Sequence, residues 1–541
     1  MFLWVAAHAF AIALFALLCY GTGRALIARL PCEDALLRAA IATGLGFCVF
    51  GQVLFVVASL GVLTRTVVFA ILALMALTFL WSGGRSRPPA AEAAAAPLAF
   101  SIIPFIEALY PPAGFDATTY HLPFARAFAD AGSLVYTDNL RFPVFPQLNE
   151  IVFSAGLLVA DDVTAQLTQW LCFVITAAVI GGMVRASSRV LAIAIWCGLP
   201  LAVFVGSNAY IDCGLTMAVA LAFAAWTQWR STQHSGWLLL IGVFAGMAAA
   251  TKYTGLFFVL FFGIAILVVR RNVALFSLGV LLIAAPWYVR IAAATGNPLF
   301  PYMESIFGPN DWYLDAARSL HPGDTFDAST LHDWLVRNIY NLRVWIVALT
   351  PIAAIGAFRE RRVRFVFFGA LLYALAFWAY ESRYNIVCIP LLAICAAEAF
   401  RRMPKPAIVI LAILLLLPDI WWESKTLKIL GKPPVTGAER DAFLRKRIWP
   451  YDAFRFLEKS GGPAYVLFAE NSAYYWKGRF LGDWFGPYRY DRVRVYLQQP
   501  VRLARVLRLF GAKYFIVRDL QGLPFEVVYA RDRVTVYRVP S

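Results

Sequence analysis

Charged residues are scarce in this chain. Asp, Glu, Lys and Arg make up 15% of its 541 residues, whereas soluble domains carry about 25%. Hydrophobic residues make up 61%, and the mean hydropathy is +0.68. Apolar runs of about 20 residues, long enough for a helix to cross a bilayer, recur along most of the chain. Strands of a membrane barrel would be shorter and would alternate in polarity. The composition therefore predicts a polytopic α-helical membrane protein.

The chain also lacks the common signatures of nucleotide and metal binding. It contains no GxxxxGK[ST] motif and no GxGxxG in a strand–turn–helix context, so ATP-driven work is not expected. Its eight cysteines lie in or beside apolar runs, without a disulfide framework or zinc spacing. The net charge of +16 is spread in small basic groups between apolar runs. Because these groups form no single patch with interleaved aromatics, nucleic acid is not an expected partner.

The apolar runs predict about fourteen membrane spans. These cover approximately residues 2–23, 38–60, 66–82, 97–111, 163–184, 190–206, 211–229, 236–251, 254–269, 273–290, 342–358, 364–380, 384–400 and 406–422. The first run has no basic residue before it and has Arg24 and Arg29 after it. This pattern is typical of a retained first span with an outside N-terminus, and not of a cleaved signal peptide.

Basic residues collect in alternate short loops. One set of loops holds seventeen Arg and Lys residues, while the short loops of the opposite set hold only Arg65, Lys252 and Arg383. This difference in basic residues between the two sets of loops appears only if segment 97–111, the weakest of the predicted spans, is counted as a span. By the positive-inside rule, the poorer set of loops faces outward. The outer face then carries the N-terminus, the long loops 112–162 and 291–341, and the C-terminal region.

The chain divides into three predicted parts. Residues 1–96 hold three N-terminal spans, 97–422 hold the main membrane core with both long outer loops, and 423–541 are soluble. In the soluble part, helix-like pieces (451–459 and 501–511) alternate with strand-like pieces (464–469, 513–518, 525–529 and 534–539). This alternation predicts a small α/β domain on the outer face. No internal repeat is visible, which disfavours the inverted-repeat architecture of many transporters.

Two aspartates lie at the predicted outer membrane surface. Asp116 follows the fourth span, and Asp212 lies in the turn between spans six and seven. A carboxylate there could act as a general base toward an acceptor hydroxyl, and the two together could share Mg²⁺ or Mn²⁺. The alternative is that each aspartate caps the helix that follows it. Near Asp116, His121 could be a ligand or a proton shuttle, and Glu150 could contact an acceptor.

Basic residues in the outward turns run against the charge bias. Lys252 and Arg383 could bind the phosphate of a lipid-linked substrate, since charge-assisted hydrogen bonds to phosphate are strong. The alternatives are snorkelling to the interface, or a salt bridge between Arg383 and Glu381. Arg126 and Arg290 are weaker candidates for the same phosphate-binding role.

Five motifs then occur in a distinctive order along the outer face. They are FDATTYHLP around Asp116, AYID ending at Asp212, ATKYTG around Lys252, GNPLFP beginning at Gly296, and SRYNIVCIP around Arg383. Together they resemble the C-type (GT-C) glycosyltransferases of bacterial membranes, which include the protein mannosyltransferases and the aminoarabinose transferase of lipid A (glycosyltransferase family 39). The likeness covers approximately residues 97–422. It implies a GT-C-like helical bundle with the active site on the outer face.

The resemblance also implies roles for individual residues. A polyprenyl-phosphate-linked sugar would be the donor, with Asp116 as the base and Asp212 as a second acidic residue. Lys252 and Arg383 would bind the donor phosphate. Other motif residues expected to contact substrate are Tyr120, Tyr253, Asn297 and Tyr384. Many relatives carry Asp-Glu where this chain has Asp116 followed by alanine, which puts direct metal binding there in question.

These observations lead to one hypothesis and two alternatives. The hypothesis is an inverting glycosyltransferase of the bacterial inner (cytoplasmic) membrane that transfers a sugar to a hydroxyl of an envelope glycan, lipid A or protein at the periplasmic face. One alternative is a multi-pass transporter or lipid-oligosaccharide flippase, with which about fourteen spans is also compatible. The other is a membrane-anchored binding or assembly subunit whose soluble tail does the work. Large outer loops and an α/β tail favour the enzyme.

Overall fold

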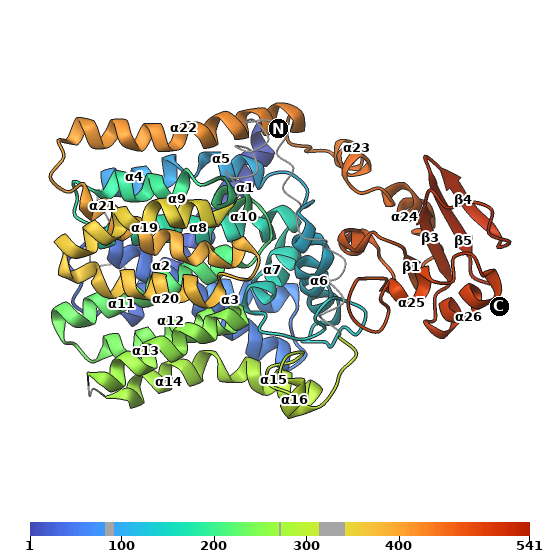
Figure 1. The fold of residues 1–541 in the computed structure, drawn as a ribbon, viewed down its shortest axis with the longest axis horizontal. Helices are drawn as coiled ribbons and strands as arrows, with labels where there is room; N and C mark the ends of the chain where they lie inside the picture. Colours follow the sequence, from blue (N-terminus) through green and yellow to red (C-terminus); the bar gives the residue numbers. More distant parts are fainter. Residues whose placement is uncertain (82–90, 270–271, 313–340, 541) are drawn as a thin grey trace.

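A computed structural model describes residues 1–81, 91–269, 272–312 and 341–540. Its helices lie side by side in a bundle, and a small domain with a β-sheet lies beyond one end of that bundle (Figure 1). Residues 313–340 of the second predicted outer loop lie outside the described residues.

Six described helical segments are long and apolar enough to cross a membrane. They are α1 (Phe2–Leu26), α2 (Ala35–Ser59), α8 (Asp162–Met183), α19 (Leu342–Arg359), η4 (Ser382–Val387) together with α21 (Cys388–Ala399), and α22 (Lys405–Leu430). The number is eight if each of two bent pairs forms one span: α9 (Arg189–Cys197) with α10 (Pro200–Ser207), bent by 71°, and α14 (Val273–Ile283) with α15 (Ala285–Thr295), bent by 51°. A multi-pass helical membrane protein is therefore confirmed, whereas the count of fourteen spans is not.

The other helical elements of the bundle do not meet both requirements of length and apolarity. They are α3 (Arg65–Trp81), α11 (Asp212–Thr232), α12 (Gly236–Thr251), η2 (Tyr253–Gly255), α13 (Leu256–Val268), α16 (Glu304–Phe307), η3 (Arg361–Val363) and α20 (Arg364–Phe377). Several of them match predicted spans in position, but they are too short or too polar to meet the criterion for a crossing helix.

The fourth predicted span differs most from the structure. Residues 97–111 do not form one helix, because α4 (Ala91–Ala99) ends before Ser101 and α5 (Ile102–Glu107) starts again after it. Pro104 has no N–H to donate to the carbonyl of Phe100, so an unbroken helix would lose a hydrogen bond there. The last span differs in the other direction, since α22 continues to Leu430 and not to 422 as predicted. The helix thus ends eight residues later than the predicted span.

Small residues let the membrane helices approach closely. A Cβ added at Gly46 of α2 would lie 1.9 Å from the carbonyl oxygen of Cys19 in α1, and one added at Gly356 of α19 would lie 1.8 Å from that of Cys395 in α21. In a membrane, where lipid tails are as apolar as the side chains, such backbone approach is a main source of helix association.

The C-terminal domain has the predicted α/β character. Its helices are α23 (Gly437–Arg447), α24 (Tyr451–Leu457), α25 (Asp491–Arg494) and α26 (Pro500–Leu509). Its strands are β1 (Ala464–Val466), β2 (Phe480–Leu481), β3 (Tyr514–Arg518), β4 (Val527–Arg531) and β5 (Val534–Arg538), in the order β2-β1-β3-β5-β4. β1 pairs in parallel with β2 and β3, and the remaining pairs are antiparallel. The sequence did not predict β2, which is only two residues long.

Candidate active site

The first outer loop is more structured than predicted. Between α5 and α8 it contains a π-helical turn, η1 (Ala117–His121), followed by α6 (Leu122–Ala131) and α7 (Leu148–Val159). In the π-turn, the N–H of Leu122 donates to the carbonyl of Ala117, five residues earlier. Asp116 stands directly before this turn and makes no side-chain capping bond to it. The cap alternative for Asp116 is therefore wrong, and its carboxylate is available for other partners.

Four charged side chains meet beside this turn. Arg383 Nη2 donates to Asp116 Oδ2 at 2.6 Å, and Arg383 Nη1 lies 3.9 Å from Asp212 Oδ2. Lys252 Nζ donates to Asp212 Oδ1 at 3.1 Å. We call Asp116, Asp212, Lys252 and Arg383 the four-charge cluster. Its members come from the loop before η1, the start of α11, the end of α12 and η4, so widely separated motifs converge on one point.

The cluster is largely removed from water. Asp116 is 8% exposed and Asp212 is 2% exposed. Asp212 begins α11, but no side-chain bond caps that helix, so its cap alternative is also wrong. Arg383 does reach Glu381, at 3.4 Å, as one alternative expected, but it bonds to the buried Asp116 as well. A buried salt bridge adds little to the stability of a fold. Buried ionisable groups with charged partners cluster at functional sites, so these four residues are a candidate functional site.

Neighbouring charges control the ionisation of Asp116 and Lys252. Burial alone would raise the pKa of Asp116, but the positive charge of Arg383, followed by that of His121, outweighs burial and lowers it. Burial alone would lower the pKa of Lys252, but the negative charge of Asp212 outweighs burial and raises it. Both groups therefore carry their charge at neutral pH.

Aromatic rings cover the cations of the cluster. The Arg383 guanidinium carbon lies 5.0 Å from the ring centre of Tyr210, and Lys252 Nζ lies 4.4 Å from that of Tyr384. The hydroxyl of Tyr210 accepts from the backbone N–H of Asp116 at 3.3 Å. Tyr384, predicted to contact substrate, is thus part of the site, and Tyr120 belongs to the π-turn itself.

Two other predicted substrate contacts hold a neighbouring loop together. Tyr253 donates its hydroxyl to the carbonyl of Phe300 at 2.6 Å. The Asn297 side chain accepts from the N–H of Leu299 at 2.8 Å and donates to the carbonyl of Tyr302 at 2.7 Å. These bonds shape the GNPLFP turn, so the structure gives both residues a role in local folding.

The arginines predicted as weaker phosphate contacts lie outside the cluster. Arg126 donates to backbone carbonyls of the C-terminal domain, including that of Trp476 at 2.8 Å and that of Tyr474. Arg290 donates to Gln147 Oε1 at 2.6 Å and to the carbonyl of Val135 at 3.1 Å. Both guanidinium groups are used in internal contacts, and their predicted role in phosphate binding stays a prediction.

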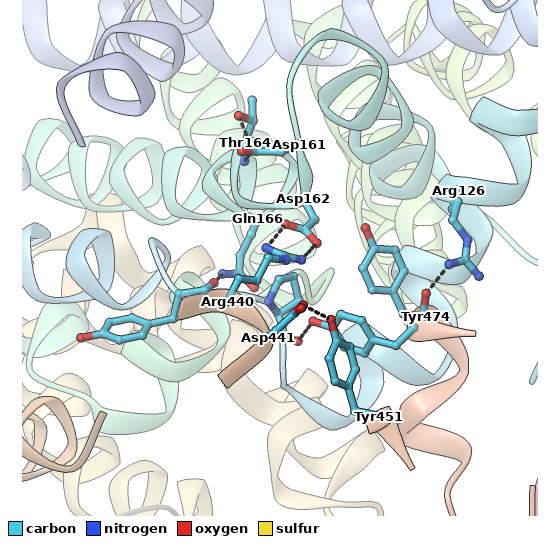
Figure 2. Close-up of polar contacts among 12 residues, drawn as sticks. Arg126, Asp161, Asp162, Thr164, Gln166, Arg440, Asp441, Tyr451 and Tyr474 are labelled. Carbon is cyan, nitrogen blue, oxygen red and sulfur yellow. Dashed lines mark hydrogen bonds and ion pairs between the residues drawn. The ribbon is translucent and has the colours of Figure 1, made fainter. Parts of the chain in front are cut away.

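The C-terminal domain docks directly beside the π-turn. Figure 2 shows Arg126 of α6 pointing at the backbone near Tyr474, and Arg440 of α23 paired with Asp162 of α8. Arg440 Nη1 and Nη2 donate to the two carboxylate oxygens of Asp162, at 3.1 and 2.5 Å. A cavity of about 200 Å³ lies at this contact. The Thr118 hydroxyl also donates to the carbonyl of Asn471, in the 3₁₀ turn η5 (Glu470–Tyr475), at 2.6 Å.

A further docking pair was not predicted from the sequence. Arg141 bonds to both carboxylate oxygens of Asp483, at 3.0 and 2.5 Å, and both side chains are about nine-tenths buried. The charge of Arg141 also helps to lower the pKa of Asp116. The C-terminal domain is thereby linked electrostatically to the four-charge cluster.

The cluster is poorly suited to a resident divalent metal. The carboxylates of Asp116 and Asp212 already face Arg383 and Lys252, whose positive charges would repel a metal ion. Among residues 1–81, 91–269, 272–312 and 341–540, no group of three or more His, Cys, Asp or Glu side chains has an arrangement that could hold one. We therefore derive no chemical step through Mg²⁺ or Mn²⁺.

Comparison with known sequences gives matches over limited lengths. A family described as SF2091/S2213 matches residues 439–538. An uncharacterised Shigella flexneri protein, SF2093/S2215, is 34% identical over 76 residues, which is 14% of this chain and 38% of that protein's length. Neither match extends over most of the chain.

Comparison with solved structures gives matches over most of the chain. ArnT from Cupriavidus metallidurans bound to undecaprenyl phosphate superposes over 83% of this chain and 98% of its own, with a TM-score of 0.51 and 15% identity. The same protein in its apo state superposes over 82% of this chain and 96% of its own, with a TM-score of 0.52 and 15% identity. This chain therefore has the GT-C-like membrane fold of the ArnT structures, as the sequence motifs predicted.

Proposed function

We propose that the protein is an inverting glycosyltransferase that moves a sugar from a polyprenyl-phosphate donor to a hydroxyl of an envelope glycan, lipid or protein. The observation that carries this proposal is the buried cluster of two carboxylates and two cations, Asp116, Asp212, Lys252 and Arg383. The fold supports it, because an ArnT structure with this architecture binds undecaprenyl phosphate.

The two cations would receive the donor phosphate. A phosphate oxygen that approaches Arg383 competes with Asp116 for the same guanidinium, which has five N–H donors in a planar fork. Donor binding would therefore loosen the 2.6 Å contact between Arg383 and Asp116. Lys252, held by Asp212 at 3.1 Å, would supply a second positive charge. Asp212 would thus position the cation that stabilises the leaving group.

Loss of its arginine partner would make Asp116 a better base. The acceptor oxygen attacks the anomeric carbon and gives its proton to the Asp116 carboxylate. The bond between the anomeric carbon and the phosphate oxygen breaks, and polyprenyl phosphate leaves with its added negative charge held by Lys252 and Arg383. Direct displacement of this kind inverts the configuration at the anomeric carbon. Tyr120 and Tyr384, which flank the cluster, would contact the sugar.

We propose that this chemistry takes place at the periplasmic face of a bacterial cytoplasmic membrane. The distribution of basic residues supports this orientation, with seventeen Arg and Lys in one set of short loops and three in the other. The N-terminus and the C-terminal domain would then both be periplasmic. A lipid-linked donor would reach the cluster laterally, from the outer leaflet.

A donor-consumption assay tests the proposal. Purified full-length protein in detergent is incubated with undecaprenyl-phosphate-linked hexoses and pentoses and with envelope extract, and released undecaprenyl phosphate is measured by mass spectrometry. We expect release by the wild type and about 100-fold less by Asp116→Asn, since a general base contributes at least about that factor. Asp130→Asn, an exposed aspartate on α6, serves as the matched control.

Two results would count against the proposal. Unchanged transfer by Asp116→Asn would remove Asp116 as the base. Failure to consume any donor, together with measurable translocation of a lipid-linked oligosaccharide in vesicles, would show a transporter or flippase and not a transferase.

A further inference from the structure

The four-charge cluster is assigned to the donor and the base, which leaves open where the acceptor binds. Glu150, predicted to contact an acceptor, pairs with His121 at 2.7 Å, and the two side chains are 0% and 2% exposed. The acceptor must therefore be recognised by other residues as well. The cavity between the membrane bundle and the C-terminal domain is the candidate, because ligand sites occur preferentially at domain interfaces.

This cavity lies between α6, the start of α8, α23, α24 and the turn η5, and its volume is about 200 Å³. Figure 2 shows side chains from both sides of the contact, with Arg126 and Tyr474 on one side and Arg440 with Asp162 on the other. The chemistry of the lining residues indicates which class of ligand the cavity fits.

Aromatic rings form much of the cavity wall. They are Tyr451 and Phe454 of α24, Tyr474 and Tyr475 of η5, and Trp476 directly after η5. An aromatic ring carries partial negative charge on its face, which attracts the weakly positive C–H groups on the face of a sugar ring. The wall therefore favours a carbohydrate ligand.

One of these rings carries a hydrogen-bond donor without a partner. Trp476 is 2% exposed, and its Nε1 has no hydrogen-bond partner among the described residues. This nitrogen lies against Gly478, another residue of the wall, where an added Cβ would be 2.7 Å from it. A buried donor without an acceptor costs stability, and an oxygen supplied by a ligand would remove that cost.

The lining has more positive than negative charge. Its charged residues are four cations and two carboxylates: Arg126, Arg440, Arg455, Lys477, Asp162 and Glu458. Arg440 is paired with Asp162. Lys477 and Arg455 share the one carboxylate of Glu458, Arg455 at 2.6 Å. Arg455 also reaches Asp441, outside the lining, at 3.8 Å. Two more cations than carboxylates line the cavity, which favours an anionic ligand.

Arg126 is the lining cation without a carboxylate partner. Its guanidinium donates to the backbone carbonyls of Ala473, Tyr474 and Trp476. These bonds use three of its five N–H donors. Among the residues that the structure describes, no carboxylate forms an ion pair with Arg126, and burial lowers the pKa of this guanidinium. An anionic group in the cavity would neutralise the buried charge.

The turn η5 joins this cavity to the segment that carries Asp116. At the start of η5, the carbonyl of Asn471 accepts from Thr118 of the π-turn at 2.6 Å. At its end, the Tyr475 hydroxyl donates to the carbonyl of Pro112. A 3₁₀ turn rises about 2 Å per residue, so Asn471 and Tyr475 are separated by about 8 Å along its axis. The cavity is therefore within reach of a short glycan whose acceptor hydroxyl lies at Asp116.

We propose, on the basis of the proposed function, that this cavity binds an acidic sugar residue of the acceptor glycan, one that bears a carboxylate or a phosphate. The sugar ring packs among the aromatic rings, with its anionic group at Arg126 and an oxygen at the Trp476 N–H. The cavity is smaller than the range of about 300–1,000 Å³ for sites of drug-sized ligands, so it fits one sugar ring and not an extended chain. The C-terminal domain thereby selects the acceptor.

Direct binding tests the site without requiring transfer. Saturation-transfer NMR on the full-length protein in nanodiscs measures dissociation constants for glucuronate, glucose 6-phosphate, glucose and inorganic phosphate. We expect the two acidic sugars to bind at least about 10-fold more tightly than glucose, because a hydrogen bond to a charged group is worth about that factor or more. They should also bind more tightly than inorganic phosphate, which lacks the sugar ring. The tighter of the two identifies the preferred anionic group.

Matched variants locate the bound sugar. Trp476→Phe keeps the ring and the backbone carbonyl that Arg126 uses, and should weaken glucuronate binding about 2- to 10-fold through loss of one hydrogen bond. Trp237→Phe, which removes another buried indole N–H without a described partner, is its control. Lys477→Gln, at the exposed mouth, should weaken binding of the acidic sugars and not of glucose. Arg518→Gln, in a larger basic cavity of about 330 Å³ on the same domain, should change neither.

Arg126→Gln should have the largest effect, at least about 10-fold on both acidic sugars, with partial recovery in Arg126→Lys. Limited proteolysis shows whether the C-terminal domain stays docked in these two variants. If it does not, Trp476→Phe and Lys477→Gln decide the question, since neither removes a contact between the domain and the bundle.

In the donor-consumption assay, Trp476→Phe and Lys477→Gln should require more envelope extract for the half-maximal rate and leave the maximal rate unchanged. This is the pattern expected when a substrate contact away from the reacting atoms is lost.

Three results would overturn the proposed sugar site: equal binding of glucose and the acidic sugars, acidic-sugar binding unchanged by both Trp476→Phe and Lys477→Gln, or inorganic phosphate bound as tightly as the sugars. A wild type that consumes no donor but binds glucuronate in a manner sensitive to these variants refutes the proposed function and not the sugar site, so the two failures are distinguishable.

Discussion

Replacement of Arg383 should reveal how much the four-charge cluster depends on one guanidinium. In Arg383→Gln, Asp116 loses its 2.6 Å partner, and Asp212 keeps only Lys252 at 3.1 Å. The Arg383 side chain is 14% exposed, so solvent replaces little of the lost interaction. Removal of one partner from a buried pair costs about 3–5 kcal/mol. We therefore expect a clear decrease in the thermal stability of the detergent-solubilised protein.

The same substitution should reduce catalysis. Removal of one group that stabilises developing negative charge costs about 2.7–4 kcal/mol, which corresponds to a rate lower by about 100- to 1,000-fold. The assay measures release of undecaprenyl phosphate from a saturating donor. Arg383→Lys should recover part of the rate, because it keeps the charge and loses the planar fork. Arg65→Gln, at an exposed position at the start of α3, is the control.

A small effect would refute this reasoning. If Arg383→Gln retained a rate within threefold of wild type and the same melting temperature, the guanidinium could not be the partner of both Asp116 and the leaving phosphate. Loss of stability without loss of rate in the remaining folded protein would limit Arg383 to a structural role.

Four further predictions follow from the structure. Arg141→Ala should free the C-terminal domain, because it leaves Asp483 buried and unpaired at a cost of about 3–5 kcal/mol; faster proteolytic release of that domain is the readout. Gly356→Leu should prevent folding of the bundle, since even a Cβ would lie 1.8 Å from a carbonyl oxygen of α21, and detergent gel filtration detects this. Because the pKa of Asp116 is lowered in the folded state, its contribution to stability should be constant above about pH 4 and lost only below it; melting of wild type and Asp116→Asn from pH 3 to 8 measures it. EDTA should leave transfer unchanged, because cations of the protein already occupy the carboxylates.

The multi-pass helical membrane architecture could be predicted from the sequence. Hydropathy marks long apolar runs directly, and the charge bias between loops assigns each turn to a face. Asp116, Asp212, Lys252 and Arg383 were predicted to share one membrane surface, and the structure brings the four side chains together. The sequence could group them because each was predicted to stand at the end of a span. The membrane surface on which they lie stays a prediction.

Contacts between segments that lie far apart in the chain could not be predicted from the sequence. Arg141 and Asp483 lie 342 positions apart, and neither segment carries a local pattern that indicates the other. The use of Arg126 as a docking residue has the same cause, since its partners are backbone carbonyls 347 to 350 residues away. The break between α4 and α5 could have been expected from Pro104, which marks a point where a continuous helix loses a hydrogen bond.

The most direct test of the account is a structure determined by electron cryomicroscopy with undecaprenyl phosphate bound to the full-length protein in a lipid nanodisc. The account predicts phosphate density within hydrogen-bond distance of Lys252 Nζ and the Arg383 guanidinium, with the contact between Arg383 and Asp116 lengthened from 2.6 Å. Phosphate density elsewhere on the protein, with the four-charge cluster unchanged, would contradict it.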